Sequence, residues 1–122
     1  MYEDEFLSLS LGQWFHELLN SIKDQFSGKS NVRYTVLSGH DTTVAPLLML
    51  LQVGDKEWPP YAANVAIELW RISNEPFVRI VYNGQPSKMK FCSAMFCPLD
   101  EFSNRVSKFS LSSEQWKAQC KL

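Results

Sequence analysis

Apolar residues recur at steps of three and four along the first part of the chain. This spacing puts them on one face of a helix and predicts an amphipathic helix that ends near residue 26. The positions are Leu7, Leu11, Trp14, Phe15, Leu18, Leu19, Ile22 and Phe26. The segment "SGKSN" follows, and its Gly28 suits a C-terminal helix cap. His16 lies inside this pattern, and we interpret it as a surface or boundary histidine.

The pattern then changes from helix to strand and back to helix. Residues 32–37, "VRYTVL", are rich in β-branched side chains and apolar on both faces. These features are typical of a strand that is buried in a sheet covered by helices. The apolar run that follows indicates a second helix. Asp41, Thr42 or Thr43 can cap that helix, and Gly54 ends it.

Residues 64–83 predict a β-hairpin. The runs "NVAIELWRI" and "FVRIVYN" alternate as strands do, and the turn segment "SNEP" separates them. The segment "SKMKF" is expected to return as a short strand. Before the hairpin, residues 55–61 are expected to form a loop, because Pro59 and Pro60 lack backbone N–H groups.

The C-terminal part predicts one more helix and a closing turn. Pro98 suits the first position of a helix. An apolar stripe then follows at helical spacing, made by Leu99, Phe102, Val106 and Phe109. The segment "SSEQWKAQC" is expected to form the closing turn.

Composition limits the classes of protein that the chain can be. Its 122 residues suit a single domain or a fragment of one, and 45% apolar content indicates a folded core. A formal net charge of −1 gives no electrostatic basis for binding nucleic acid. No membrane span is expected, since no apolar run reaches about 18 residues. The acidic start "MYEDEFLSLS" lacks the features of a signal peptide.

The three cysteines leave several alternatives open. Cys92 and Cys97 are near enough in sequence to close a small loop, which leaves Cys120 over. An odd cysteine indicates a free thiol, an intermolecular bridge or a partner outside this chain. Metal binding is not expected, because the sequence has neither C-x-x-C spacing nor a histidine near these cysteines.

The segment "LSGHDTTV" carries the candidate chemistry. A change from strand to helix gathers N–H groups that favour an anion, and Gly39 lets the backbone come close. A protonated His40 can donate to a phosphoryl oxygen, and Asp41 can give a proton to a departing alkoxide. The set suits phosphate-ester cleavage, with an acidic working pH that keeps the acid protonated. The alternative is a chance His-Asp pair in which Asp41 only caps the helix.

Several blocks of the sequence resemble one family. "YTVLSGHDTTVAPLL" closely resembles the C-terminal motif of the histidine acid phosphatases, a branch of the histidine phosphatase superfamily. "WPPYAANVAIELW", "VRIVYNGQP", "FCSAMFCPLDEF" and "WKAQC" resemble later blocks of that family, so the similarity spans residues 34–120. The resemblance implies an α/β fold: the C-terminal part of a mixed, mostly parallel sheet flanked by helices, with a C-terminal β-hairpin and helix.

The resemblance also implies roles for single residues. His40 would contact the transferring phosphoryl group of a phosphate monoester, Asp41 would be the general acid, and Gly39 and Thr42 would complete the substrate-binding set. The family nucleophile is a histidine in an Arg-His-Gly-x-Arg motif, which this sequence lacks. Residues 1–122 are therefore expected to be the C-terminal portion of such an enzyme and inactive alone. The family needs no metal or organic cofactor.

The same resemblance implies a pairing, a location and a partner. Cys92 would bridge Cys97, and Cys120 would pair with an upstream cysteine that this chain does not contain. The location would be extracytoplasmic, either secreted or lysosomal. Because one edge of the expected sheet is uncovered, the chain is expected to bind the missing N-terminal portion of the phosphatase or to self-associate.

An alternative function stays open, and three further residues need an interpretation. The chain could be a non-catalytic phosphate-binding or interaction module derived from a phosphatase. Glu68 is interpreted as a half-buried structural carboxylate rather than a catalytic one. Trp58 and Tyr61 flank the two prolines, where they either line the mouth of a pocket or pack the loop.

Overall fold

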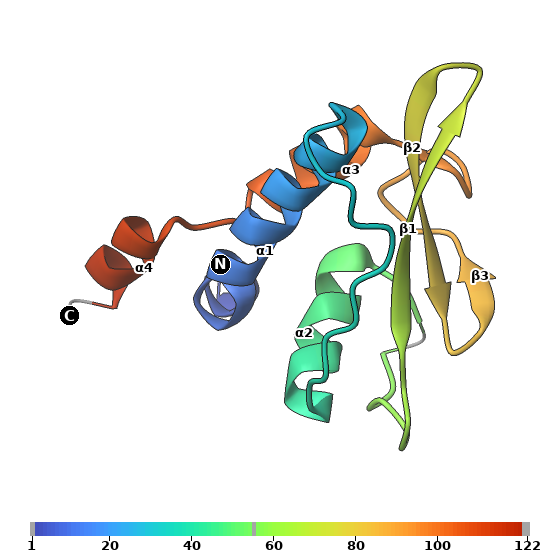
Figure 1. Cartoon of the computed structure of the whole chain (residues 1–122). Coiled ribbons are helices and arrows are strands. Elements are labelled where there is room, and N and C mark those ends of the chain that lie inside the picture. Colours follow the sequence, from blue (N-terminus) through green and yellow to red (C-terminus); the bar gives the residue numbers. More distant parts are fainter. Residues whose placement is uncertain (1, 55, 121–122) are drawn as a thin grey trace. The chain divides into compact units, whose positions relative to one another are not determined.

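A computed structural model of the chain describes residues 2–54 and 56–120. The helices are α1 (Tyr2–Phe26), α2 (Asp41–Leu51), α3 (Leu99–Ser107) and α4 (Ser113–Gln119). The strands are β1 (Val65–Ile72), β2 (Glu75–Tyr82), β3 (Gln85–Ser87) and β4 (Cys97–Pro98), as labelled in Figure 1. The described part of the chain is therefore α/β, as expected.

The chain forms two compact units. Unit 1 consists of Met1–Leu37 and Arg105–Leu122, and unit 2 consists of Ser38–Asn104. Helix α3 crosses from unit 2 into unit 1. All the residues of the expected phosphate site lie in unit 2.

In unit 1, α1 confirms the first predicted helix. Its apolar positions include the buried side chains of Leu7, Phe15, Leu19 and Ile22. The helix ends in the cap that Gly28 predicted. The Lys29 N–H donates to the Asp24 carbonyl at 2.9 Å, and Gly28 adopts a φ of +81° that other residues rarely take.

The C-terminal segment of unit 1 lies against the middle of α1. The Leu111 N–H donates to the Gly12 carbonyl at 2.9 Å, and the Trp116 indole donates to the Leu9 carbonyl at 2.9 Å. A Cβ atom on Gly12 would lie 2.9 Å from the Phe109 carbonyl oxygen, so only glycine fits this approach. The expected closing turn is α4, which begins at a capping box between Ser112 and Gln115.

Unit 2 contains the predicted hairpin. Strand β1 pairs antiparallel with β2 from Val65↔Tyr82 to Ile72↔Glu75. The two residues between them, Ser73 and Asn74, both have positive φ, as a type I′ hairpin turn requires. Strands β3 and β4 also pair with β2 in antiparallel fashion, and Figure 1 shows β3 beside β2.

One sequence expectation is not confirmed, and two need correction. Every pairing between described strands is antiparallel, so the expected mostly parallel sheet does not appear among the described residues. The returning strand is β3, which ends at Ser87, rather than "SKMKF". The last long helix begins at Leu99 instead of Pro98, because Pro98 pairs with Phe77 in the sheet.

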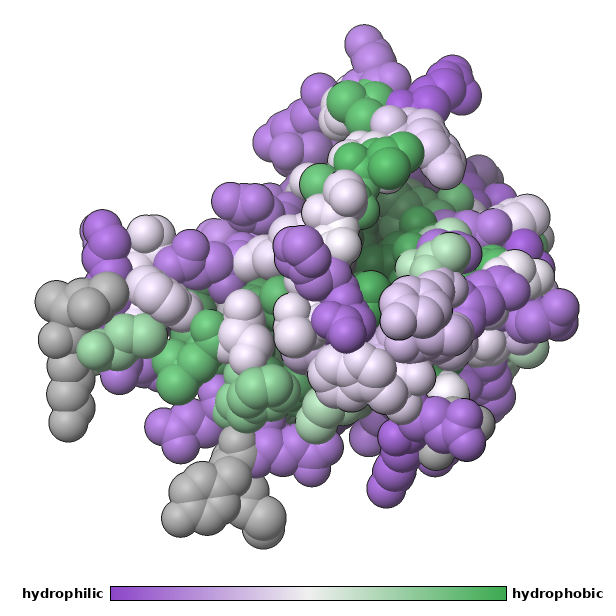
Figure 2. Space-filling view, turned by 90° about the horizontal axis from the view of Figure 1, so that it is seen from below, coloured by the Kyte–Doolittle hydropathy of each residue, from purple (hydrophilic) through white to green (hydrophobic). Residues whose placement is uncertain are grey.

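The strand expected at residues 32–37 is also absent from the described structure. This segment has no strand pairing, and its apolar side chains are exposed, with Tyr34 at 85% and Val36 at 74%. A strand exists only through hydrogen bonds to a neighbour, and no described segment supplies one. Apolar residues also reach the surface among hydrophilic ones on the face shown in Figure 2.

Candidate functional site

The start of α2 forms the centre of the candidate site. His40 is the N-cap residue, with extended backbone at φ −117° and ψ 170°. Its carbonyl accepts from the N–H groups of Thr43 and Val44 at 2.9 and 3.0 Å, and its own N–H donates to Thr43 Oγ1 at 3.4 Å. The expectation that Asp41, Thr42 or Thr43 caps the helix is therefore wrong, because the helix already begins at Asp41.

Gly39 allows the chain to enter this turn closely. A Cβ atom at residue 39 would lie 3.2 Å from Thr43 Cβ and 3.3 Å from its Cγ2. These distances are shorter than ordinary van der Waals contact. The glycine therefore lets the backbone lie against the first turn of α2, where the sequence placed the anion contact.

The Asp41 carboxylate is held by two donors. Its Oδ1 accepts from the Thr42 backbone N–H at 2.8 Å, and its Oδ2 accepts from the Trp58 indole N–H at 2.8 Å. Both His40 and Asp41 are exposed, so a ligand can reach them. Thr42 contributes its backbone rather than its hydroxyl to this contact.

The first turn of α2 offers an anion fewer backbone donors than the sequence suggested. The N–H of Thr42 is used by Asp41, and those of Thr43 and Val44 are used by the His40 carbonyl. The expected anion contact would therefore depend more on the His40 side chain than on these N–H groups.

Glu68 lies in the sheet, paired within the fold. Its Oε1 accepts from Arg79 Nε at 2.6 Å and from Trp70 Nε1 at 3.0 Å. The Arg79 guanidinium also lies 5.3 Å from the centre of the Trp70 ring and 5.4 Å from that of Phe96. The hydrogen bond from Arg79 lowers the pKa of Glu68, and the bond from Trp70 acts in the same direction against the opposing effect of burial. These contacts support the interpretation of Glu68 as a structural carboxylate.

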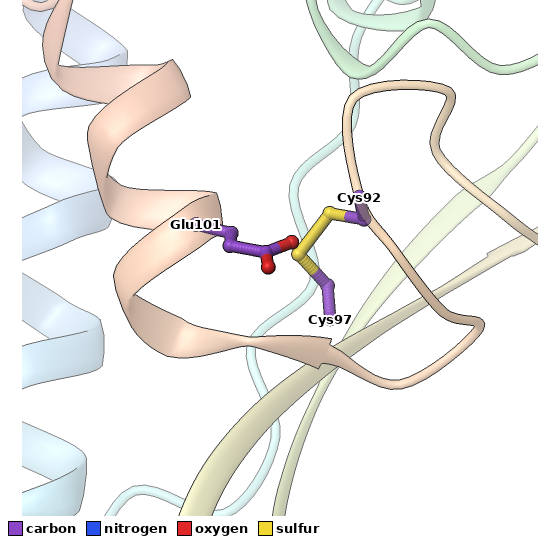
Figure 3. A group of neighbouring side chains, drawn as sticks. All are labelled: Cys92, Cys97 and Glu101. Carbon is purple, nitrogen blue, oxygen red and sulfur yellow. A yellow bond between two sulfur atoms is a disulfide. The ribbon is translucent and has the colours of Figure 1, made fainter.

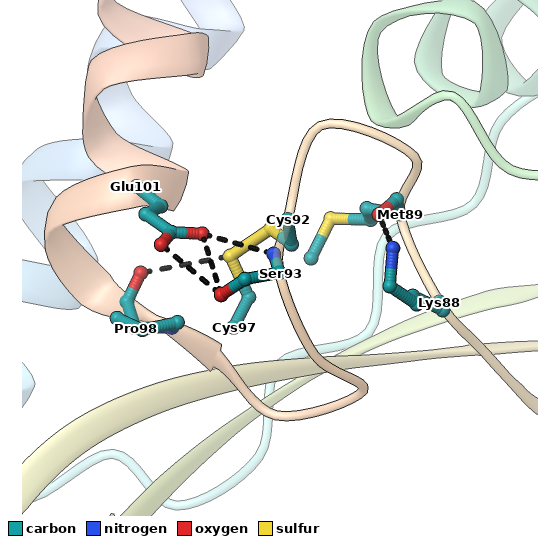
Figure 4. Close-up of a disulfide and its surroundings, with 7 residues drawn as sticks. All are labelled: Lys88, Met89, Cys92, Ser93, Cys97, Pro98 and Glu101. Atoms are coloured by element: carbon teal, nitrogen blue, oxygen red, sulfur yellow. Dashed lines mark hydrogen bonds between the residues drawn. A yellow bond between two sulfur atoms is a disulfide. The ribbon is translucent and has the colours of Figure 1, made fainter.

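Cys92 and Cys97 form a disulfide, the bridge implied by the resemblance. Glu101 of α3 points toward the two sulfurs (Figure 3). Its carboxylate accepts from the backbone N–H and the hydroxyl of Ser93, each at 3.2 Å (Figure 4). The bonded sulfurs are not thiolates, so these three side chains lack the donor set that a metal would need.

The structure thus brings Gly39, His40, Asp41 and Thr42 together with Trp58. The sequence left the role of Trp58 undecided, and the structure places its indole N–H on the proposed acid. The signal available in the sequence was the two prolines after Trp58, which indicate a rigid loop.

His16 is exposed on α1 in unit 1. Cys120 forms no disulfide within the described residues.

No helix in the described part of the chain is both long enough and apolar enough to span a membrane.

Comparison with known proteins gives a consistent family. The profile described as "Histidine phosphatase superfamily (branch 2)" matches residues 3–83. Lysophosphatidic acid phosphatase type 6 of Bos taurus is 37% identical, over 98% of this chain and 29% of that protein. Counting factor 60 of Dictyostelium discoideum is 37% identical, over 77% of this chain and 23% of that protein. Prostatic acid phosphatase of Homo sapiens is 31% identical, over 89% of this chain and 29% of that protein. The chain therefore spans less than a third of the length of these relatives.

Proposed function

The chain belongs to branch 2 of the histidine phosphatase superfamily, and from this membership we propose that it carries the phosphate-contacting and proton-donating part of an acid phosphatase. In this proposal His40 donates to a phosphoryl oxygen of a phosphate monoester, and Asp41 protonates the leaving oxygen. Gly39 and Thr42 shape the contact with the phosphate. The observation that carries the proposal is the exposed Asp41 carboxylate, fixed by two donors beside His40.

The reaction needs a nucleophile from another part of the complete enzyme. By family resemblance this is a histidine, which forms a bond to phosphorus as the bond from phosphorus to the leaving oxygen breaks. The electron pair of the broken bond passes to the leaving oxygen, which takes the proton of Asp41. Water then hydrolyses the phosphohistidine. No cofactor enters this scheme.

Residues 1–122 are proposed to be the C-terminal portion of such an enzyme. Their sequence contains no Arg-His-Gly, so the chain lacks the attacking group and the arginines beside it. We expect no phosphatase turnover from the chain alone. A phosphomonoesterase assay on the purified chain measures this directly, and turnover that disappears in Asp41→Ala would contradict the proposed division of roles.

Phosphate binding tests the site independently of turnover. Inorganic phosphate, added at mildly acidic pH, should shift the ring resonances of His40 in a saturable way in NMR spectra. The exposed His16 on α1 serves as an internal control and should stay unchanged. Equal shifts at both histidines, or none at His40, would contradict a phosphate site at the start of α2.

A non-catalytic phosphate-binding module remains the second candidate, because the sequence has no nucleophile motif. The two candidates differ when a nucleophile-bearing portion is supplied in trans. The enzyme proposal expects turnover from the mixture, whereas a binding module would bind phosphate at His40 without turnover.

We further propose an extracytoplasmic location, secreted or lysosomal. The support is the Cys92–Cys97 disulfide, since such bonds persist mainly in oxidising compartments.

A further inference from the structure

We propose that Trp58 is a positioning residue for Asp41 and holds the carboxylate of this acid in its working orientation. The catalytic meaning of this role rests on the proposed function. The pairing itself rests on geometry: the indole Nε1 lies 2.8 Å from Asp41 Oδ2, although the two residues are 17 positions apart. Both residues belong to unit 2.

Two donors fix the carboxylate more firmly than one could. The Thr42 N–H holds Oδ1, and the Trp58 indole holds Oδ2. With both oxygens bound, rotation of the side chain would break at least one hydrogen bond. The acid is thereby kept in a single orientation, as a group that must meet a leaving oxygen requires.

The chemistry of the indole suits this task. An indole N–H can donate but cannot accept, so Trp58 cannot take the proton that Asp41 delivers. When Asp41 has given up its proton, the two N–H groups donate to an ionised carboxylate. Hydrogen bonds to an ionised oxygen are stronger than those to a neutral one. In this proposal Trp58 and Thr42 therefore stabilise the carboxylate that remains after the proton has moved to the leaving oxygen.

The loop around Trp58 restricts the position of the indole. Pro59 limits the backbone of Trp58 to extended conformations and is itself buried. The end of the loop is tied to the hairpin, because Asn64 N–H donates to Asn83 Oδ1 and Asn83 N–H donates to the Asn64 carbonyl, both at 3.0 Å. The Trp58 side chain is 61% exposed, so packing in the core does not explain its position.

Indole NMR signals of the 122-residue chain test the proposal. The sequence has four tryptophans, and Trp58→Phe identifies the Trp58 signal by its loss while keeping an aromatic ring. As the pH falls from neutral to acid, the Trp58 N–H signal should move when Asp41 takes up a proton. Asp41→Asn should abolish that movement. His40, Glu57 and Lys56 are also titratable and lie near these residues in the sequence. Only the part of the pH-dependent movement of the Trp58 signal that is lost in Asp41→Asn is therefore evidence for the pairing.

Two other indoles are matched controls. Trp70 donates to Glu68, so its signal should also move with pH but should do so unchanged in Asp41→Asn. Trp116 donates to a backbone carbonyl, which does not titrate, so its signal should show no such step. A Trp58 signal that is invariant with pH, or that moves identically in Asp41→Asn, would overturn the proposal.

A second measurement at neutral pH does not depend on acid stability. The Trp58 indole N–H should exchange with solvent several-fold faster in Asp41→Ala than in the unmodified chain, because its acceptor is gone. Equal exchange rates would overturn the pairing.

The phosphate titration at His40 separates this proposal from the proposed function. Phosphate binding without coupling between Trp58 and Asp41 contradicts the positioning role alone. Coupling without phosphate binding contradicts the proposed function and supports the pairing.

Discussion

At the residue scale, two carboxylates of unit 2 each accept a hydrogen bond from an indole N–H but differ in their second donor. Glu68 is bound by the positively charged Arg79, whereas Asp41 is bound by the neutral backbone N–H of Thr42. A guanidinium keeps its carboxylate ionised, which suits a structural pair. The two neutral N–H donors on Asp41 carry no full positive charge, unlike the guanidinium on Glu68. This difference supports the proposed roles of Asp41 as the acid and of Glu68 as a structural residue.

The Glu68 pair predicts a pH dependence of stability. Because the pKa of Glu68 is lowered in the folded chain, the pair stabilises the fold above the ordinary value of 4.5. That contribution is lost as the pH falls through the lowered folded value. Arg79→Met should return the pKa of Glu68 toward the ordinary value, as measured by NMR of its side-chain carboxyl carbon. The side chains of Arg79 and Glu68 are 24% and 35% exposed, so the loss in free energy of unfolding at neutral pH should stay below about 1 kcal/mol.

Arg71→Met is the matched control, since it removes the same charge from strand β1 at a residue opposite Pro76. The control should leave the pKa of Glu68 unchanged. An equal effect of both variants would show that net charge, rather than the pair, sets the pKa of Glu68.

The local part of the site could be predicted from the sequence, whereas its long-range part could not. Residues 39–42 are contiguous, so the change from an extended segment to α2 at His40 brings them together. The contact of Trp58 with Asp41 depends on how the loop before β1 folds back, and neither residue type nor spacing encodes that path.

At the element scale, the helices and the hairpin were predictable because their patterns are local. Helix α1 shows its apolar period from Leu7 to Phe26, and the hairpin needs only a two-residue turn between alternating runs. The segment of residues 32–37 shows the limit of this reasoning. Its composition favours a strand, but a strand also needs a partner, and the described residues provide none.

The exposed apolar segment of residues 32–37 predicts that the chain associates with another polypeptide. Its exposed apolar side chains should pair with a second copy or with the nucleophile-bearing portion that the proposed function requires. Val36→Lys should weaken self-association of the chain in sedimentation experiments, because a charge on this segment disfavours pairing. Val36 is 74% exposed, so the free energy of unfolding should change by less than about 0.5 kcal/mol.

Asn31→Lys adds the same charge at an exposed polar residue and should leave association unchanged. A chain that sediments as a strict monomer before any substitution would contradict this prediction.

At the scale of the whole molecule, the two units should respond differently to loss of the disulfide. Cys92 and Cys97 are buried and both belong to unit 2. Replacing both with alanine should destabilise unit 2 by about 2 kcal/mol, as expected for closure of a short loop. Hydrogen exchange measured by mass spectrometry should show faster exchange in β2, with exchange in α1 unchanged.

Cys120→Ala is the control, because it removes a sulfur from unit 1 and leaves the disulfide in place. Equal acceleration of exchange in both units after loss of the disulfide would show that the chain unfolds as one cooperative body.

The division into units also bears on how the chain is made. Unit 2 is continuous in sequence, whereas unit 1 joins two segments that lie on either side of it. During synthesis α1 emerges before unit 2, and all of unit 2 must follow before the residues that donate to the Leu9 and Gly12 carbonyls emerge. During that interval the nascent helix lacks its C-terminal partner and presents apolar side chains to chaperones.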